Sequence, residues 1–140
     1  MEFSRRDFLK GTIAALVASS FPDAAHGEEA GELNKAHEPL IRVPKVAQDG
    51  RVVPVTVDLS GHPMEEDHYI KSIEIFDMQS KTPDRGRAVL TPATGRAFLS
   101  TRVKMPDGKH NIKVVIECSK HGRFESAVTM SVVGGQCKEV

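Results

Sequence analysis

The sequence predicts an all-β protein, a sandwich of short strands that begins after residue 36. Apolar residues recur at every second position in several segments, as in Val53, Val55 and Val57, and this is the period of a half-buried strand. Turn sequences such as Asp49-Gly50 and Asp107-Gly108 separate these segments. Short alternating strands at this spacing favour two packed sheets.

Six segments are expected to be strands. In order they are residues 40–46, 51–59, 69–78, 96–104, 111–118 and 123–133. The second contains Pro54, which cannot donate a backbone hydrogen bond, so this strand is expected at a sheet edge or bulged there. A turn at Ser60-Gly61-His62-Pro63 leads to the third. We find no internal repeat and no helical period after residue 27.

Length and charge limit the classes of function. A chain of 140 residues is expected to form one domain. Its formal net charge is zero, with 19 basic and 19 acidic residues, so no general attraction to nucleic acid or to an anionic membrane is expected. Two cysteines, Cys118 and Cys137, are too few for a disulfide framework or a four-cysteine metal centre.

The first 27 residues have the features of an export signal. Ser4-Arg5-Arg6-Asp7-Phe8-Leu9-Lys10 resembles the twin-arginine motif, and an apolar stretch, 11–21, follows it. That stretch is too short for a membrane span of about 20 residues and suits a signal-peptide core. Small residues around His26 predict cleavage after Gly27. The mature protein is therefore expected in the periplasm, free of the membrane.

Two polar segments flank the predicted sandwich, which spans residues 37–133. Residues 28–36 are expected to be a loose N-terminal arm, and 134–140 a flexible tail that carries Cys137 after two glycines.

Four histidines and one cysteine lie where loops of a sandwich can meet. His37 opens the first strand, His62 and His68 lie between two strands, and Cys118 and His121 follow a strong strand. A thiolate with several imidazoles suits zinc, iron or copper. Each residue alone has an ordinary alternative, a solvated histidine or a buried thiol. His26, in the signal, and His110, in a turn, are expected to take no part.

These segments, taken together, resemble a known family. His62-Pro-Met-Glu-Glu-Asp-His68-Tyr-Ile-Lys-Ser-Ile-Glu and Cys118-Ser-Lys-His121-Gly-Arg-Phe-Glu-Ser are similar to the iron-binding segments of the desulfoferrodoxin and neelaredoxin superoxide reductases. His37-Glu-Pro-Leu-Ile resembles the first ligand segment of that family. The three occur in family order and cover roughly residues 35 to 130.

The resemblance implies an immunoglobulin-like sandwich of about seven strands with one mononuclear iron. His37, His62, His68 and His121 would be equatorial ligands, and Cys118 the axial thiolate. Such a centre alternates between Fe²⁺ and Fe³⁺ and reduces superoxide to hydrogen peroxide. An electron donor, expected to be a small periplasmic carrier, would restore the ferrous iron. The chain does not identify that donor or decide whether it forms a homo-oligomer.

The sequence departs from the family before the first histidine. Many members have a Glu-Lys pair there, where this chain has Lys35 and Ala36. Lys35 could still supply positive charge, and Glu38 follows the histidine, although strand alternation can direct it elsewhere. We therefore expect a ferric state that is not capped by the family's glutamate, and slower turnover.

The tail leads to a second hypothesis. Val133-Gly134-Gly135-Gln136-Cys137 loosely resembles the Gly-Gly-Cys arm of periplasmic sulfur-carrier proteins of thiosulfate oxidation, and residues 53–57 and 100–105 fit that family as well. Its terminal cysteine carries sulfur covalently. Gln136 and the charged end of the tail depart from the motif, so a frayed tail or a redox-active thiol remain alternatives.

A third hypothesis keeps the metal without the enzyme. The site could hold zinc or copper structurally, or hold iron for electron transfer or sensing. Five ligands are unusual for structural zinc, which prefers four, so iron is favoured. A sulfur carrier needs Cys137 and no metal, whereas a reductase needs the five ligands and can lose Cys137.

Overall fold

The computed structural model describes residues 31–134. The chain divides into two units, Met1–Lys35 and Ala36–Val140. In the first unit, the described residues are helical, and the helix extends through residue 36. A loose arm was expected over 28–36; Glu32, Leu33 and Lys35 are all good helix formers. The predicted signal, residues 1–27, lies outside the described residues.

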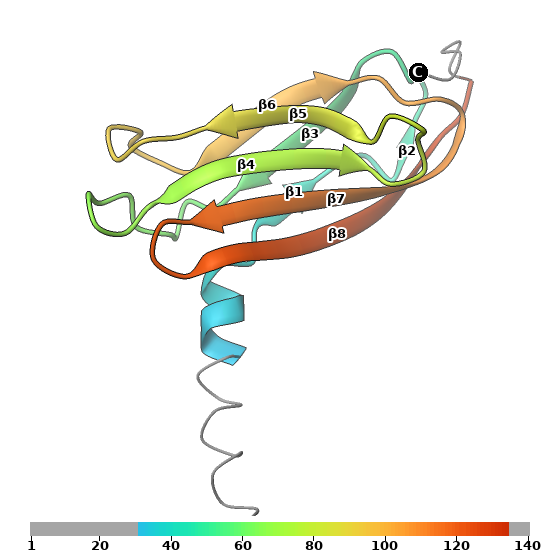
Figure 1. Ribbon diagram of the computed structural model, residues 1–140. Coiled ribbons are helices and arrows are strands. Elements are labelled where there is room, and N and C mark those ends of the chain that lie inside the picture. Colours follow the sequence, from blue (N-terminus) through green and yellow to red (C-terminus); the bar gives the residue numbers. More distant parts are fainter. Residues whose placement is uncertain (1–30, 135–140) are drawn as a thin grey trace, which may run out of the picture. The chain divides into compact units, whose positions relative to one another are not determined.

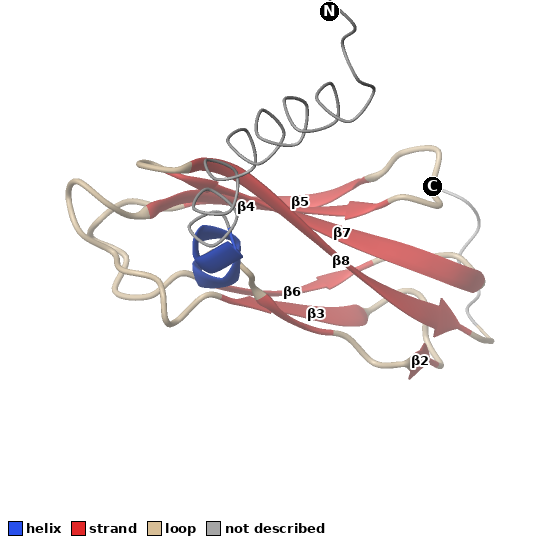
Figure 2. Ribbon diagram, turned by 90° about the horizontal axis from the view of Figure 1, so that it is seen from below, coloured by secondary structure: helices blue, strands red, loops and turns tan. Residues whose placement is uncertain are grey.

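The second unit is the predicted all-β sandwich. Its strands are β1 (Leu40–Arg42), β2 (Val46–Ala47), β3 (Val53–Asp58), β4 (Ile70–Asp77), β5 (Asp84–Val89), β6 (Phe98–Val103), β7 (Gly108–Cys118) and β8 (Gly122–Val132). One sheet has the order β1-β3-β6 and the other the order β2-β8-β7-β4-β5. Figures 1 and 2 show these two layers facing each other.

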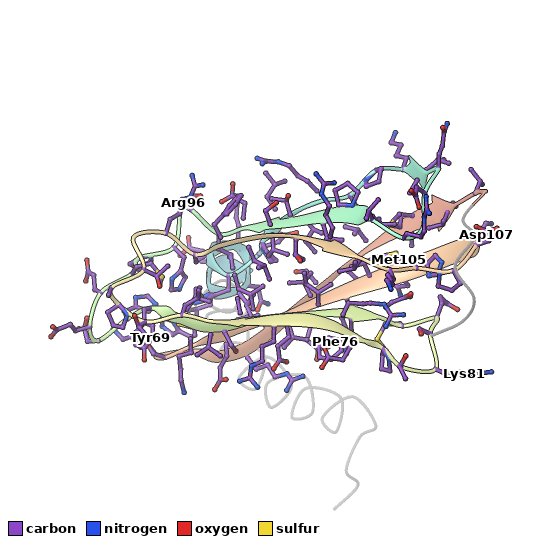
Figure 3. All side chains as sticks on the ribbon, turned by 90° about the horizontal axis from the view of Figure 1, so that it is seen from above. Tyr69, Phe76, Lys81, Arg96, Met105 and Asp107 are labelled. Carbon is purple, nitrogen blue, oxygen red and sulfur yellow. The ribbon has the colours of Figure 1, made fainter. Side chains whose placement is uncertain are left out.

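The two layers enclose an aliphatic core, as the period-two pattern predicted. Side chains of both sheets fill the space between the layers (Figure 3). Buried residues alternate with more exposed ones along β3. The core includes Val53, Val55, Val57, Ile70, Ile73, Ile75, Met105, Ile112, Val114, Ile116, Met130 and Val132. Burying each of these large side chains contributes on the order of 1.5–3 kcal/mol.

Two predicted strands differ from the structure in instructive ways. The segment 40–46 is divided between β1 and β2, which lie in different sheets, and Pro44 stands in the break. At Pro54, β3 has β6 on one side only, because β1 reaches no further than Thr56. Pro54 therefore lies at a locally open edge, as predicted.

A buried charged cluster joins the strands at the end of the sandwich marked by Lys81 and Asp107 in Figure 3. His110 Nδ1 lies 2.9 Å from Asp77 Oδ2, and its Nε2 lies 2.6 Å from the carbonyl oxygen of Pro106. An Arg85 guanidinium nitrogen lies 3.6 Å from the same carboxylate oxygen. His110 is therefore part of β7 and buried, rather than in the expected turn. In the described part of the chain, no helix is both long and apolar enough for a membrane crossing.

Candidate metal centre

Three loops meet at the other end of the sandwich, which Tyr69 marks in Figure 3. His37 precedes β1, and His62 and His68 lie in the connection between β3 and β4. Cys118 ends β7, and His121 lies in the turn between β7 and β8. These are the five residues that the sequence singled out, and the fold brings all of them together.

The four imidazoles form a closed ring. Neighbouring ring centroids are 4.8 Å apart for His37 and His62, 4.7 Å for His62 and His68, 4.9 Å for His68 and His121, and 5.1 Å for His121 and His37. The diagonal from His37 to His68 is longer, 6.3 Å. The four rings therefore surround a common point, although the group whose donor atoms all lie within 4.8 Å of one another contains His37, His68, His121 and Cys118 and does not include His62.

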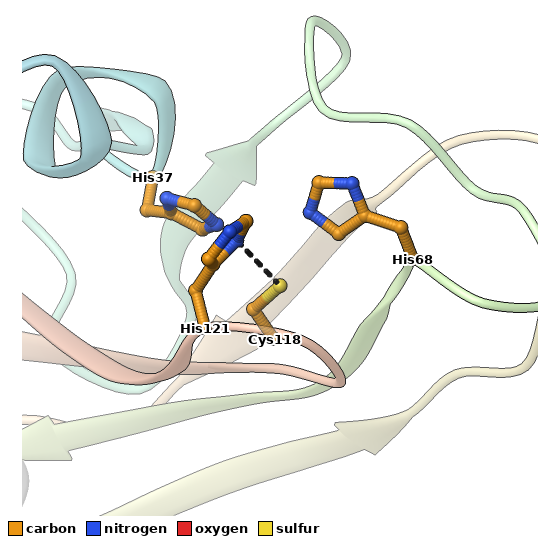
Figure 4. A group of neighbouring side chains, drawn as sticks. All are labelled: His37, His68, Cys118 and His121. Atoms are coloured by element: carbon orange, nitrogen blue, oxygen red, sulfur yellow. Dashed lines mark hydrogen bonds between the residues drawn. The ribbon is translucent and has the colours of Figure 1, made fainter.

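The thiol of Cys118 lies against this ring. Its Sγ is 3.6 Å from His62 Nε2 and 3.7 Å from His121 Nδ1, and the second contact is drawn in Figure 4. Nitrogen atoms of His37, His68 and His121 and this sulfur all lie within 4.8 Å of one another. Cys118 is 2% exposed, so the sulfur approaches the imidazoles from inside the protein.

The β7–β8 hairpin sets the spacing of Cys118 and His121. Cys118 pairs with Gly122, which leaves a turn of three residues between the strands. Gly122 has a φ of 84°, in the left-handed region that glycine adopts at little cost, and three-residue hairpin turns use such a residue. The short turn therefore holds the thiol and the imidazole on one side of the hairpin.

Hydrogen bonds tie the β3–β4 connection to this hairpin. Ser119 donates its backbone N–H to the carbonyl oxygen of Tyr69 at 2.9 Å, and Tyr69 donates its N–H to Ser119 Oγ at 3.0 Å. Within the connection, Glu65 and His68 exchange backbone hydrogen bonds of 3.0 and 3.1 Å. The loops therefore position the histidines through hydrogen bonds that need no metal.

Two neighbouring residues orient imidazoles of the ring. The carbonyl oxygen of Pro63 lies 2.7 Å from His62 Nδ1. Because a carbonyl only accepts, Nδ1 carries the proton and the Nε2 lone pair is free to bind a metal. Phe124, on β8, stacks on His37 at 4.1 Å with an interplanar angle of 6°. This contact fixes the plane of the His37 ring.

The environment favours neutral histidines. Desolvation lowers the pKa of His62, and the other imidazoles lower it further against an opposing contribution from the Pro63 carbonyl. Desolvation also lowers the pKa of His121, aided by His37, His68 and the Lys120 ammonium. Neutral imidazoles are the form that binds metals, so the lowered pKa values favour coordination by His62 and His121.

The donor set fits one transition-metal ion. Metal–nitrogen bonds of about 2.0–2.1 Å place adjacent ligand atoms roughly 3 Å apart, and His37 Nε2 lies 3.1 Å from His62 Nε2. The buried Nε2 of His68 has no hydrogen-bond partner among the described residues. A buried nitrogen without a partner is costly, and coordination would satisfy it. His121 is exposed, so one side of the cluster faces solvent.

The structure does not place the other residues named from the sequence in the histidine cluster. Glu38 is exposed between buried His37 and buried Pro39, and among the described residues it makes no hydrogen bond or ion pair. Lys35 belongs to the first unit, and its role stays a prediction. Cys137 and His26 lie outside the described residues.

Sequence reasoning assigned no role to several residues around the cluster. These are Phe124, Pro63 and the Tyr69–Ser119 pair. Phe124 and Ser119 lie inside the segment that resembles the superoxide reductases, which was the available signal. The Pro63 carbonyl and the Tyr69 backbone have no sequence signal, because any residue provides these groups.

Comparison with protein families identifies a relationship along most of the chain. The family model described as sulfur oxidation protein SoxY matches residues 28–137. The chain belongs to the SoxY family. Among curated proteins, none matches it.

Solved structures of two kinds resemble this SoxY-family chain. A superoxide reductase (neelaredoxin) from Ignicoccus hospitalis has a TM-score of 0.65 and 25% identity over 80% of this chain and 93% of its own. The sulfur carrier protein SoxY from Chlorobium limicola f thiosulfatophilum has a TM-score of 0.54 and 23% identity over 69% and 80%. The superoxide reductase from Nanoarchaeum equitans has a TM-score of 0.57 and 19% identity over 69% and 94%.

The similar structures therefore include both a sulfur carrier and superoxide reductases, the two families that the sequence resembles. The fold is common to the superoxide reductases and the sulfur carrier. The family model supports sulfur chemistry, whereas the cluster of four histidines and a cysteine supports a metal centre. The chemistry of the site must therefore be argued from its own residues.

Proposed function

We propose that this SoxY-family chain is a superoxide reductase whose mononuclear iron is bound by His37, His62, His68, His121 and Cys118. The observation that carries the proposal is the ring of four imidazoles with one thiol against it, because this set exceeds the four ligands of a structural zinc site. The similarity to the neelaredoxin from Ignicoccus hospitalis adds support.

Each residue of the cluster has a defined part in this proposal. The four imidazoles bind through neutral nitrogens, and for His62 this atom is Nε2, because Nδ1 donates to Pro63. Cys118 binds as a thiolate from the buried side. Iron held there would supply the single electron that superoxide accepts. Two protons from solvent on the side of exposed His121 complete hydrogen peroxide, and an outside donor returns the electron.

Charge would guide the anionic substrate to the site. Four neutral imidazoles leave one negative ligand, the thiolate, against the two positive charges of a ferrous ion. Lys120 is exposed beside His121, and its ammonium contributes to the lowered pKa of that imidazole. A net positive site attracts an anion such as superoxide and raises its rate of encounter.

Metal analysis and optical spectroscopy test the proposal. Protein loaded anaerobically with ferrous iron is expected to hold one iron per chain. Oxidation by superoxide should produce a visible thiolate-to-iron(III) absorption band with formation of hydrogen peroxide, and a reductant should bleach the band. Protein that stays colourless and binds no iron would overturn the proposal.

Two cysteine variants provide matched controls. Cys118→Ser is expected to abolish the absorption band and lower iron retention, because the thiolate is the source of the charge-transfer transition. Cys137→Ser should keep the iron, the band and the consumption of superoxide. Equal spectra for the wild type and Cys118→Ser would show that the sulfur is not a ligand.

Sulfur carriage on Cys137 is a second candidate, favoured by the family model, whose match extends to residue 137. In this case Cys137 would hold a covalent sulfur adduct, and Cys137→Ser would lose it while Cys118→Ser kept it. Intact-protein mass spectrometry of each variant after exposure to sulfur compounds distinguishes the two candidates.

The proposed location is the periplasm, on the evidence of residues 4–27 alone. Export there by the twin-arginine route would deliver a folded, metal-loaded protein. Its electron donor would then be a small periplasmic carrier.

A further inference from the structure

The strand β8 has one backbone edge that is mostly unpaired. On one side, β7 pairs with β8 along its whole length, from Gly122 to Val132. On the other side, β2 reaches only Ser131 and Val132. Within residues 31–134, no strand pairs with this side of β8 from Gly122 to Met130, and Figure 1 shows β8 along the margin of its sheet. A free edge of this length is a template for pairing with another strand.

The core-facing side chains of β8 stay partly exposed along this open edge. Phe124 and Val128 pack against the core, yet both are only half-buried, as is Ser126 between them. Met130, which precedes the first residue paired with β2, is buried. Burial therefore increases where a neighbouring strand covers the edge. Another strand beside the open part would remove further apolar surface of Phe124 and Val128 from water, which is favourable.

The free backbone groups of the open edge belong to alternate residues. Ser131 directs its N–H away from β7 and donates it to the carbonyl oxygen of Lys45 at 3.0 Å. Because hydrogen-bonding groups alternate between the two sides of a strand, the other odd-numbered residues direct their N–H and C=O groups to the open edge. These residues are Arg123, Glu125, Ala127 and Thr129.

The outward-facing side chains of the open edge are complementary to a second copy of the same edge. The edge is centred on Ser126, so two copies that pair antiparallel about this residue overlap along its whole length. Glu125 then lies opposite Ala127 of the second copy. Arg123 lies opposite Thr129 of the second copy. No like charges face each other, and the residues with free backbone groups meet as hydrogen-bonded pairs.

The core-facing side chains favour the same register. Phe124 lies opposite Val128 of the second copy, and aromatic residues paired with β-branched residues stabilise antiparallel strands. A register centred on Glu125 would place two carboxylates opposite each other, which is unfavourable. A register centred on Ala127 would extend to Ser131, which already pairs with β2. Ser126 is therefore the centre that uses the open edge fully.

We propose that two copies of this chain pair through their open β8 edges, antiparallel about Ser126, and join their five-stranded sheets into one. The register is self-complementary in charge, side-chain size and backbone hydrogen bonding, so the partner is a second copy of the chain. The inference goes beyond the proposed reductase and does not depend on iron, because none of the five proposed ligands takes part in the pairing. Failure of either proposal leaves the other standing.

Sedimentation equilibrium of the purified protein over a series of concentrations tests the pairing. We expect a monomer–dimer equilibrium. Ala127→Glu places a carboxylate opposite Glu125 of the second copy at two symmetric positions, so the dissociation constant should rise by roughly two- to thirtyfold. Ala127→Lys places opposite charges there, and the dissociation constant should fall. A monomer at every concentration, or equal dissociation constants for the three proteins, would overturn the proposal.

The stability of the single chain separates dimer loss from unfolding. Ala127 pairs with Lys113 of β7 in the same copy. Ala127→Glu should therefore stabilise the monomer, and Ala127→Lys should destabilise it, the reverse of their effects on the dimer. Denaturant unfolding at low protein concentration measures this difference. A weaker dimer in a variant whose fold is at least as stable as the wild type arises from the edge itself.

A cysteine at the proposed axis tests the register. Opposite residues of a non-hydrogen-bonded antiparallel pair have Cα atoms about 4.5 Å apart, a separation that a disulfide can bridge. In a Cys137→Ser background, Ser126→Cys should form a crosslinked dimer on mild oxidation. Ser100→Cys, at an exposed position of β6, is the matched control and should crosslink far less. Equal crosslinking of the two variants would overturn the register.

Discussion

Phe124 orients the proposed ligand His37 through direct contact between their rings. It stacks on His37 at 4.1 Å, and His37 is 2% exposed. Aromatic pairs contribute about 0.5–1.5 kcal/mol beyond the burial of their surface. The stack therefore links the packing of β8 to the geometry of the histidine ring.

Replacing Phe124 by leucine tests this link. Phe124→Leu keeps an apolar side chain but removes the stacked ring, so we expect iron to dissociate several-fold faster with a loss of stability near 1 kcal/mol. Iron loss to a chelator and denaturant unfolding measure the two effects. Phe98→Leu, on the other sheet, is the control and should leave iron loss unchanged. Equal iron loss in both variants would contradict a role for the stack.

Acid should destabilise the metal-free protein through the same histidines. The pKa values of His62 and His121 lie below the usual value in the fold, whereas the unfolded imidazoles titrate near 6.5. The unfolded chain therefore binds more protons below that pH, and the free energy of unfolding decreases as pH falls from about 6.5 toward the folded pKa values and levels off below them.

Urea unfolding of chelator-treated protein between about pH 7.5 and pH 5 measures this dependence. The double variant His62→Gln, His121→Gln should show a smaller loss of stability over the same range. An unchanged pH dependence in the variant would assign the effect to other groups.

At the scale of elements, the turn between β7 and β8 holds two proposed ligands. Gly122→Ala forces a side chain into the left-handed region, which costs roughly 1–2 kcal/mol. We expect lower stability and weaker iron retention, because relief of the strain would move Cys118 relative to His121. Gly95→Ala is the matched control, since a Cβ there meets nothing within 4 Å and the φ is not left-handed. Full iron retention by Gly122→Ala would show that the turn tolerates the change.

The elements also show how much of the fold follows from sequence. Alternation located β3, β4, β7 and β8 because each has one face in the core. β5 was missed because its sequence, Asp-Arg-Gly-Arg-Ala-Val, is half-charged and contains a glycine. It forms because β4 offers a free edge, and a one-residue shift between Ile75 and Phe76 accommodates it. Pairing of this kind depends on the neighbouring strand β4 and leaves no periodic pattern of apolar residues in the sequence of β5 itself.

The candidate site was predictable only in part, for the same reason. His37, His62, His68, Cys118 and His121 were named from their segments and from resemblance. Their spacing depends on the three-residue turn and on the hydrogen bonds between Tyr69 and Ser119, which only the assembled sheets provide. His110 was expected in a turn after Gly108, but β7 begins at Gly108 and carries this histidine into the core.

At the scale of the whole molecule, the charged cluster of Asp77, His110 and Arg85 lies far from the histidine ring. Asp77→Asn leaves two buried partners without their carboxylate, and breaking such a buried interaction costs about 3–5 kcal/mol. Thermal unfolding should detect the loss, whereas the iron spectrum should be unchanged. Glu74→Gln removes a more exposed ion pair with Arg87 and should cost below about 1 kcal/mol. A changed iron spectrum in Asp77→Asn would show that the two ends are coupled.

The length of β8 has a consequence for how such a chain can evolve. Gly122 starts the strand beside the histidine ring and Val132 ends it at the opposite end, where Met130 pairs with His110, and ten residue steps of strand amount to roughly 30 Å. At this separation we expect substitutions at one end to leave the other unperturbed, so that selection can modify either end separately. A lineage of sulfur proteins can thereby keep, gain or lose a metal centre without redesigning its tail, and family descent alone is a poor guide to which chemistry a given descendant retains.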